Sequence, residues 1–401
     1  MAIHWPMVQI REVAVPIERP ETPMPGQTYR QIGVRLWGQG AYEREPIDGG
    51  QTRYATLSRV KADDIIVNKI WARNGSVAVV PAVLAGCFGS GEFPTFAPIK
   101  EKLYPRWFHW ITKTSDFWQQ CDEKSQGTSG KNRIRPEQFL SVEIPLPPLA
   151  EQQRIAARIE ELARRVEEAR GLRREAVEEA EALVNVTARQ LLAEVDTPIF
   201  ELREWLDENR NGIQTGPFGA QLGADDFVES GVPVVTIGNV QHSGLMTGNL
   251  KYVAPEKAQS LKRFQMKQGD LLFARMGTVG RSCVVPASAE GWLYNYHIIR
   301  VALDSSRVEP RYIHWAIRAS ADTENYLAEK IRGATRQGVN SDIVGSLPCR
   351  VPTIPEQRRI VAYLDGLQAR VDELRRLQAE TQGELDALLP SVLAKAFAGE
   401  L

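Results

Sequence analysis

Cysteine and histidine are scarce among the 401 residues of this sequence. The four cysteines, Cys87, Cys121, Cys283 and Cys349, are scattered without a close pair. This spacing excludes a cysteine-based zinc site and fits a reducing compartment, so we expect a cytoplasmic protein. The five histidines show no metal-ligand spacing either, and we expect no metal site.

Long apolar runs are also missing. The most apolar window, Val77 to Phe88, is interrupted by Pro81 and Gly86 and is too short to span a bilayer. The first ten residues lack a basic stretch followed by an apolar run, so we expect neither a signal peptide nor a membrane association. With 43% hydrophobic and 25% charged residues, the composition is typical of a soluble globular protein with room for two domains and additional helix.

An overall excess of positive charge is absent, since the net charge is −1. This argues against nucleic acid as a partner, but basic residues are clustered locally. The stretch from Lys251 to Arg281 holds seven basic residues against two acidic ones, and the stretch from Lys124 to Arg135 holds four basic residues and no acidic one. Local positive faces suffice to meet a phosphate backbone, although ordinary solvated charge explains either cluster equally well.

Catalytic motifs are missing as well. An adenine methyltransferase needs an Asp/Asn-Pro-Pro-aromatic loop, whereas the double proline Pro147-Pro148 lies between leucines. The glycine-rich segments 216–219 and 277–280 lack the lysine of a phosphate-binding loop, so we interpret them as turns. No paired carboxylates with a nearby lysine indicate a nuclease. We therefore expect a chain without enzymatic activity.

An internal repeat is the strongest signal that is present. Residues 151–195 align with residues 356–400 at a constant offset of 205, without a gap, with identities at 16 of 45 positions. Each copy begins with Glu-Gln, at Glu151-Gln152 and Glu356-Gln357, after a proline-containing segment. Proline before a helix is a start signal, so the repeat predicts two long helices.

Apolar residues recur in both predicted helices with the 4–3 spacing of a helix pair, flanked by Glu and Arg. We expect Pro390 to kink or end the second helix. The alternative is that each helix packs only on the core of its own domain. The predicted seam consists of Ile155, Ile159, Leu162, Val166, Ile360, Leu364, Leu367, Val371 and Leu374.

The segments before the helices match more faintly. Residues 60–66 parallel residues 266–272, and residues 75–82 parallel residues 280–287. These pieces are short, β-branched and punctuated by Gly and Pro, which predicts strands and turns, whereas Pro105 to Cys121 and Pro310 to Lys330 favour helix. We expect mixed α/β domains over 1–147 and 197–353, with long helices over 148–196 and 354–401.

The order of domain, helix, domain, helix constrains the geometry. If the second helix pairs closely with the first, it must run back along it, which gives an antiparallel coiled coil with a pseudo-two-fold axis. At about 1.5 Å per residue, 45 residues form a rod of roughly 65 Å. Two unequal domains related by a dyad match the dyad of a DNA duplex, so we expect them to read two different half-sites.

At these residues the chain resembles the specificity subunit of a type I restriction–modification system. The helix starts at Glu151-Gln152 and Glu356-Gln357 are similar to that family's two helical regions. The second domain is similar to a target-recognition domain through residues 212–222, 231–233, 269–275, 277–280, 295–297 and 333–336. The first domain is similar more loosely, through residues 32–35, Gly38, Gly40, 92–96 and 127–128, and it lacks a GPFG-like opening.

The resemblance implies a non-catalytic subunit that directs two modification subunits to an asymmetric, split DNA sequence. Those partners are adenine methyltransferases that use S-adenosylmethionine, and restriction subunits that use ATP and Mg are a further partner. The paired helices would set the spacer and dock the methyltransferases. A non-catalytic protein–protein scaffold with two binding heads is the alternative, which the near-neutral charge favours.

For DNA contact we expect side chains that neutralise phosphates and fork onto base edges, as Arg does on guanine and Asn or Gln on adenine. Tyr296 is the aromatic candidate that we expect to find in the core instead. The candidates are Lys69, Arg73, Lys131, Asn132, Arg133 and Arg135 in the first domain, and Lys262, Arg263, Arg275, Arg281, Tyr294, Tyr296, His297, Arg332, Arg336, Gln337 and Asn340 in the second.

Overall fold

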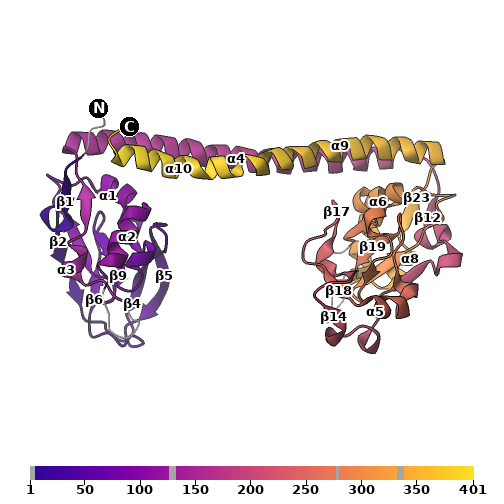
Figure 1. The fold of residues 1–401 in the computed structure, drawn as a ribbon, viewed down its shortest axis with the longest axis horizontal. Helices are drawn as coiled ribbons and strands as arrows, with labels where there is room; N and C mark the ends of the chain where they lie inside the picture. The colour runs from indigo at the N-terminus through magenta and orange to yellow at the C-terminus, as the bar shows by residue number, and fades with distance from the viewer. Residues whose placement is uncertain (1–4, 126–131, 277–279, 332–337) are drawn as a thin grey trace. The chain divides into compact units, whose positions relative to one another are not determined.

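The computed structural model describes residues 5–125, 132–276, 280–331 and 338–401 (Figure 1). The chain divides into two compact units, which we call unit 1 (Met1–Arg173 with Ala379–Leu401) and unit 2 (Arg174–Gln378). Each unit contains a mixed α/β domain and a part of the paired long helices. Within the described ranges, no helix has the length and apolarity needed to cross a membrane.

The domain of unit 1 is built mainly from short antiparallel strands. Its sheets have the orders β2-β10-β7-β8, β3-β6-β9-β4-β5 and β1-β11, and β4 pairs with β9 in parallel. The strands are β1 (Met7–Gln9), β2 (Ala14–Ile17), β3 (Pro20–Glu21), β4 (Thr28–Val34), β5 (Ala41–Asp48), β6 (Leu57–Arg59), β7 (Ile65–Val67), β8 (Val77–Val79), β9 (Phe88–Gly89), β10 (Thr95–Pro98) and β11 (Glu143–Pro145). The helices are α1 (Pro105–Ile111), α2 (Ser115–Glu123), α3 (Pro136–Phe139) and the start of α4 (Leu149–Ala193).

The domain of unit 2 repeats this plan. Its sheets have the orders β13-β22-β19-β20, β14-β18-β15-β21, β16-β17 and β12-β23. The strands are β12 (Ile199–Glu201), β13 (Ile213–Thr215), β14 (Phe227–Val228), β15 (Val232–Val235), β16 (Val240–Gln241), β17 (Gly244–Leu245), β18 (Lys251–Val253), β19 (Leu271–Ala274), β20 (Ser282–Val284), β21 (Leu293–Tyr294), β22 (Ile298–Val301) and β23 (Pro348–Arg350). The helices are α5 (Pro255–Ser260), α6 (Pro310–Ala319), α7 (Ala321–Ile331), α8 (Ser341–Gly345) and α9 (Ile354–Glu380), whereas α10 (Gln382–Phe397) belongs to unit 1.

The two domains share topology, which confirms the internal repeat and the mixed α/β fold. The sheet β2-β10-β7-β8 corresponds to β13-β22-β19-β20, and the pair β1-β11 corresponds to β12-β23. Both segments that we predicted as helical are helical, and each holds two helices, α1 with α2 and α6 with α7. In unit 1 the reason is Thr114, whose hydroxyl accepts a hydrogen bond from the Phe117 N–H and caps the start of α2.

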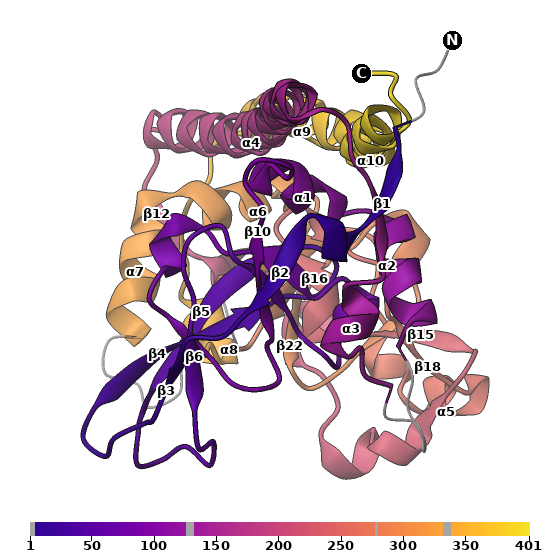
Figure 2. The same cartoon turned by 90° about the vertical axis from the view of Figure 1, so that its left-hand side faces the viewer.

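In unit 1, α4 and α10 lie side by side and run antiparallel. Arg154 donates to the Leu401 carbonyl at 2.8 Å, and Arg170 pairs with Asp386 at 2.8 Å, so positions further along α4 meet earlier positions of α10. Helix α1 lies between these helices and the sheets (Figure 2). Ile155 and Ile159 of α4 are therefore buried in one cluster with α10, α1 and the sheets.

In unit 2, the end of α4 pairs with α9 in the same antiparallel sense, and Glu181 forms an ion pair with Arg375. Apolar residues of both helices share one cluster with the core of the domain, so the helix pair and the helix-to-domain packing are parts of the same core. Leu367 packs against this cluster and Leu374 is half-buried, as are Leu162 and Val166 of α4 in unit 1. The members from the helices are Val184, Ala188 and Leu192 of α4 and Ile360, Leu364 and Val371 of α9.

The second long helix is interrupted at Thr381, between α9 and α10, and not at Pro390. The expectation that Pro390 ends the helix was wrong, because this residue lies inside α10, whereas a kink at Pro390 stays a prediction. A proline removes one backbone hydrogen bond, and here Leu389 and Leu393 on either side of it pack on the core of unit 1 and hold the helix together.

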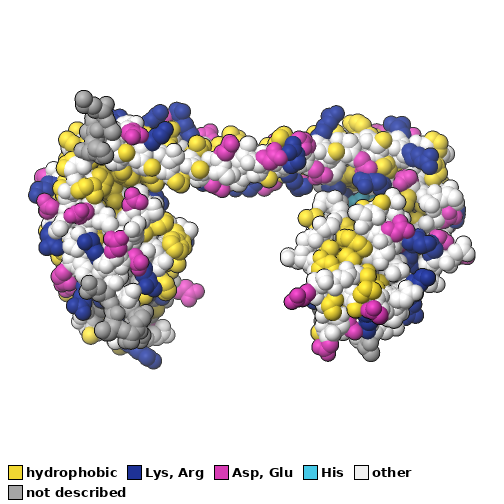
Figure 3. Space-filling model, viewed as in Figure 1, with side chains coloured by type: hydrophobic (Ala, Val, Ile, Leu, Met, Phe, Trp, Pro, Cys, Tyr) yellow, Lys and Arg dark blue, Asp and Glu magenta, His cyan; other side chains and the backbone are white. Residues whose placement is uncertain are grey.

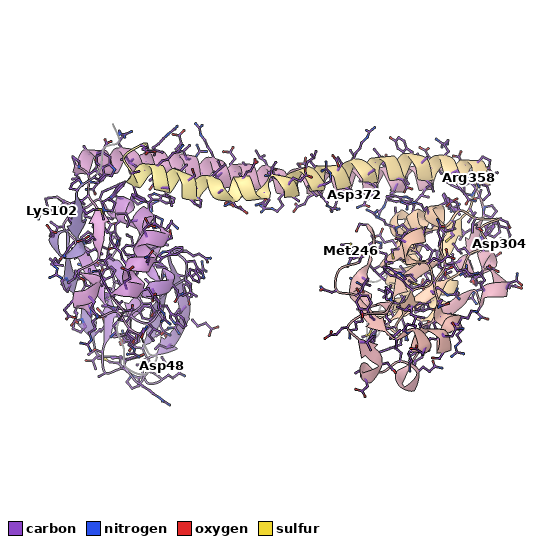
Figure 4. All side chains as sticks on the ribbon, viewed as in Figure 1. Asp48, Lys102, Met246, Asp304, Arg358 and Asp372 are labelled. Carbon is purple, nitrogen blue, oxygen red and sulfur yellow. The ribbon has the colours of Figure 1, made fainter. Side chains whose placement is uncertain are left out.

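A buried glutamine fastens each helix start to its domain. The Gln152 amide nitrogen donates to the carbonyls of Lys102 and Pro147, and its oxygen accepts from the Tyr104 N–H, each at 2.8 Å. Lys102 lies beneath the start of α4 (Figure 4). Gln357 makes the corresponding bonds, donating to the Pro352 carbonyl at 2.8 Å and accepting from the Glu309 N–H at 2.7 Å. These bonds explain why a glutamine stands at the same place in both copies.

Candidate nucleic-acid interface

Four of the basic candidates, two in each domain, belong to the tips of equivalent hairpins. The hairpin β7–β8 of unit 1 has the tip segment 68–76, and the hairpin β19–β20 of unit 2 has the tip segment 275–281. Neither tip segment contains an acidic residue, whereas the first carries Lys69 and Arg73 and the second carries Arg275 and Arg281. The strands that lead into both tips are largely buried, so the basic residues that flank each tip are carried on strands anchored in the core.

The same two backbone hydrogen bonds hold both tips. The Lys69 N–H donates to the Glu92 carbonyl at 3.1 Å, and the Lys69 carbonyl accepts from the Ile134 N–H at 2.9 Å. In unit 2 the Arg275 N–H donates to the His297 carbonyl, and its carbonyl accepts from the Val339 N–H, both at 2.9 Å. Lys69 and Arg275 therefore occupy the same place in each domain, although the surrounding sequences differ.

Beside Arg275 the second domain forms a cleft of about 390 Å³, which we call the aromatic cleft. Phe218 is 55% exposed, Met276 46% and Tyr296 39%, so its walls offer apolar surface to solvent. Figure 3 shows apolar side chains gathered on the viewed face of this unit. The lining residues are Phe218, Arg275, Met276, Tyr296, His297, Gly338, Val339 and Asn340.

The guanidinium of Arg275 is oriented within this cleft. Its Nη1 donates to the Tyr296 carbonyl at 3.0 Å, and its central carbon lies 5.7 Å from the centroid of the Phe218 ring. Its Nε is buried and has no acceptor among the residues that the structure describes. The backbone bond thus fixes one end of the guanidinium at the cleft, and a forked donor of this kind suits a phosphate or the acceptor edge of guanine.

Two glycines allow the walls to approach this closely. A Cβ on Gly216 would lie 2.2 Å from the Asn295 carbonyl oxygen, and a Cβ on Gly338 would lie 2.7 Å from the Arg275 carbonyl oxygen. Neither contact is possible for another residue without moving the backbone. Gly216 in the Gly-Pro-Phe-Gly segment therefore places Phe218 against Tyr296, with their ring centroids 5.9 Å apart.

The two tyrosines exchange the roles that we expected. Tyr294 is 0% exposed in the core, where burial raises its pKa to about 12, so the expectation that it contacts DNA is wrong. Tyr296, which we expected in the core, is exposed, and its ring centroid lies 3.8 Å from that of His297. Both residues of β21, Leu293 and Tyr294, are buried, so buried and exposed residues do not alternate along this strand, which ends at Tyr294.

In the first domain the candidates form a smaller group around Lys69. Ile134 connects the segment 132–135 to the hairpin tip through its bond to the Lys69 carbonyl. Arg133 and Arg135 are exposed, and Arg133 pairs with Glu92 at 3.1 Å. Asn132 and Arg73 are half-buried.

The remaining candidates lie outside these groups or serve the fold. Lys262 and Arg263 are exposed on the turn Lys262–Phe264, and Arg281 donates to the Ile237 carbonyl at 3.0 Å. The Asn340 oxygen accepts from the Ile343 N–H at 2.8 Å and caps α8, which leaves its amide nitrogen for a ligand. Four predicted contacts lie outside the described residues: Lys131, Arg332, Arg336 and Gln337.

Two histidines of the second domain, His314 and His242, contact other residues of the domain. Burial lowers the pKa of His314 to about 3 and that of His242 to about 4, so both are neutral at pH 7. The two ring nitrogens of His314 lie 3.3 Å from the Ser282 hydroxyl and 3.2 Å from the His242 carbonyl. Within the described ranges, no group of three His, Cys, Asp or Glu side chains could hold a metal ion.

Sequence reasoning missed the exposed apolar residues at the hairpin tips. Trp71 is 45% exposed beside Lys69 and Arg73, and Met276 follows Arg275. Trp37, whose N–H donates to the Asn74 carbonyl, is exposed next to the first tip. Periodicity gives no information on segments this short, and the only available signal was an apolar residue adjacent to a basic one within an acid-free turn.

Fold and site together define a class of duplicated mixed α/β proteins in which each domain is fastened to paired long helices and presents a basic hairpin tip. Residues 5–176 match the family model described as the type I restriction modification DNA specificity domain. Solved structures with this fold include a chain from a study of complex assembly and conformational transition of the type I R-M system, at a TM-score of 0.74, 23% identity and 100% coverage of both chains. The HsdS subunit from Thermoanaerobacter tengcongensis matches at a TM-score of 0.59 and 24% identity, over 99% of this chain and 97% of the other.

Curated relatives agree with these matches. The EcoKI specificity subunit of Escherichia coli (strain K12) is 26% identical over 314 residues, which cover 73% of this chain and 64% of the relative. The StySPI specificity subunit of Salmonella potsdam is 22% identical over 309 residues, which cover 75% of this chain and 66% of the relative. The aligned part thus spans slightly less than two thirds of these relatives. The chain is therefore similar to type I restriction–modification specificity subunits, in sequence over these regions and in fold.

Proposed function

We propose that this chain is a non-catalytic DNA-recognition subunit that reads a split, asymmetric target with one half-site for each domain. The observation that carries the proposal is the repeated clamp on Lys69 and Arg275, which holds a basic, acid-free hairpin tip in the same place in both domains. The first target-recognition domain is assigned to residues 1–147 and the second to residues 197–353. The half-sites differ because a lysine stands in the first tip where a forked arginine stands in the second.

The proposed partners follow from the relatives, which are named type I restriction enzyme specificity subunits. Two adenine methyltransferase subunits that use S-adenosylmethionine would bind this chain in the cytoplasm, and two restriction subunits that use ATP and Mg would join them. This chain itself holds no cofactor in the proposal. Its contribution is to bind and orient the duplex.

The paired helices act as the spacer in this proposal. Antiparallel pairing of α4 with α10 and with α9 supports it, since the ion pairs and apolar contacts keep each helix in register with its partner. Inserting one heptad into α4 after Arg173 and one into the second helical segment after Gln378 should lengthen the tolerated spacer and leave the half-site bases unchanged. A changed base preference would mean that the helices take part in reading.

The direct test is footprinting of the chain together with its methyltransferase on duplexes selected for binding. Two separated contacts of different sequence support the proposal, whereas a single contiguous contact or no sequence preference contradicts it. The competing hypothesis of a protein–protein scaffold predicts that duplex binding is weak and insensitive to salt. A steep fall in affinity between about 50 and 200 mM salt would reject that hypothesis, because phosphate contacts release counterions.

A further inference from the structure

An exposed large apolar side chain stands at the tip of each of the two equivalent hairpins. Trp71 and Met276 are exposed to nearly the same extent, 45% and 46%. A single exposed apolar residue needs no explanation. Trp71 lies two residues after Lys69 and Met276 lies one residue after Arg275, so the two side chains belong to equivalent hairpin ends without occupying the same position. An exposed apolar residue close to the clamped basic residue in both domains indicates a shared use of this part of the domain.

The backbone beneath both side chains is fixed. In unit 1 the Asn68 side-chain oxygen accepts from the N–H groups of Ile70 and Trp71, at 3.0 and 3.3 Å, and Gly75 closes the turn with a φ of 74°. In unit 2 a β-bridge joins Met276 to Gly338. A side chain on a held backbone loses little conformational entropy when it enters a partner, so the turn under Trp71 and the bridge at Met276 preorganise these two side chains for insertion.

The charges around both side chains suit one kind of partner. Lys69 and Arg73 flank Trp71, Arg275 precedes Met276, and neither tip segment contains an acidic residue. An apolar group between cations matches a duplex groove, in which phosphates border the stacked, apolar faces of the bases. A protein partner would have to place acidic groups on both sides of an apolar pocket to match it equally well.

We propose that Trp71 and Met276 are apolar wedges that enter a DNA groove and partly unstack one base step in each half-site. This inference rests on the proposed function and adds to it a second mode of reading. At this base step the protein would discriminate between DNA sequences by how easily the step deforms, without a hydrogen bond to the bases. The larger, aromatic Trp71 should disturb its step more than Met276 does.

The test uses the full chain assembled with its methyltransferase and duplexes that carry 2-aminopurine at successive steps of each half-site. Binding of the wild type should raise the fluorescence at one step of each half-site. Trp71→Ala should abolish the rise in one half-site alone and Met276→Ala in the other. Each variant should bind the intact duplex about tenfold more weakly, in line with the loss of one base-stacking contact.

A duplex with a mismatch at the responding step separates a wedge from a simple contact. Because that step is already unstacked, it should restore the binding of the matching variant to within about twofold of the wild type. Met246→Ala is the matched control in unit 2, since Met246 is 51% exposed but lines a different pocket from Met276, and Val83→Ala serves in unit 1. Both controls should behave as the wild type.

The outcomes distinguish the wedge from the proposed function. If the wild type binds no duplex with sequence preference, the proposed function fails. If the wild type binds specifically without a fluorescence change, or if Trp71→Ala weakens intact and mismatched duplexes equally, only the wedge is overturned. Loss of methyltransferase association in the tip variants, with the fluorescence change retained, would assign the tips to a protein contact and also overturn it.

Discussion

Replacing Gln152 by alanine should destabilise unit 1 more than the loss of one polar side chain ordinarily does. The side chain is fully buried and makes hydrogen bonds to two carbonyls and one N–H of the backbone. Each buried backbone group that loses its partner costs about 1–3 kcal/mol, and water entering the vacated space recovers a part of this. We therefore expect the free energy of unfolding of unit 1 to fall by about 3–5 kcal/mol.

The corresponding change in unit 2, Gln357→Ala, should cost about 2–3 kcal/mol, because it breaks two bonds of this kind. Since a loss of 1 kcal/mol lowers the Tm of a unit this large by about 2–4 °C, calorimetry should show losses of roughly 10 °C and 6 °C. Hydrogen exchange followed by mass spectrometry assigns each loss to its unit. Gln153→Ala, at an exposed neighbouring position, is the control and should change either value by less than about 0.5 kcal/mol.

An isosteric substitution gives the sharper form of this test. Gln152→Glu keeps the shape but turns a carboxylate oxygen toward the carbonyls of Lys102 and Pro147. The folded state should raise the pKa of this carboxyl, so the variant should be less stable than Gln152→Ala at pH 7 and should gain stability as the pH falls toward 5. If both variants matched the Gln153→Ala control, the glutamine would not be the fastener that we describe.

Three further predictions concern unit 2. Arg275→Ala should weaken binding at one half-site about 10- to 100-fold in a titration. Arg275→Lys should restore the salt dependence of binding but not the base preference, and an equal base preference with Lys and Arg would exclude a forked contact. Tyr294→Phe should leave DNA affinity within twofold of the wild type, because the ring is buried, and a tenfold loss would show that the hydroxyl reaches DNA. Burial lowers the pKa of His314 to about 3, whereas histidine in the unfolded chain has a pKa near 6.5. The free energy of unfolding should therefore fall by up to about 1.4 kcal/mol for each pH unit below 6.5, and this pH dependence should be shallower in denaturation of His314→Asn. An unchanged pH dependence in the variant would refute the buried neutral state.

The repeat carried most of what the sequence could predict. A gap-free offset of 205 was enough to predict two long helices, their antiparallel pairing and a duplicated mixed α/β domain, because helix periodicity and the order of segments constrain geometry directly. It could not predict that the break falls at Thr381 instead of Pro390. The packing of Leu393 on the core of unit 1 decides that point, and the sequence pattern does not report it.

The candidate site was predictable by residue type but not by arrangement. Arg275, His297 and Asn340 are far apart in the sequence, and only the folded sheet brings them to one cleft. The burial of Tyr294 and the exposure of Tyr296 depend on where β21 ends, which is a property of the tertiary structure. Apolar residues at short hairpin tips carry no periodic signal, so their exposure could not be predicted from the sequence.

Sequencing of methylated adenines, in cells that carry this chain and the proposed methyltransferase partner, tests the central claim most directly. The account predicts a motif of two unequal halves around a spacer of fixed length, with Lys69→Ala relaxing the bases of one half and Arg275→Ala those of the other. A contiguous motif, or variants that relax both halves alike, would contradict the claim that each domain reads its own half-site.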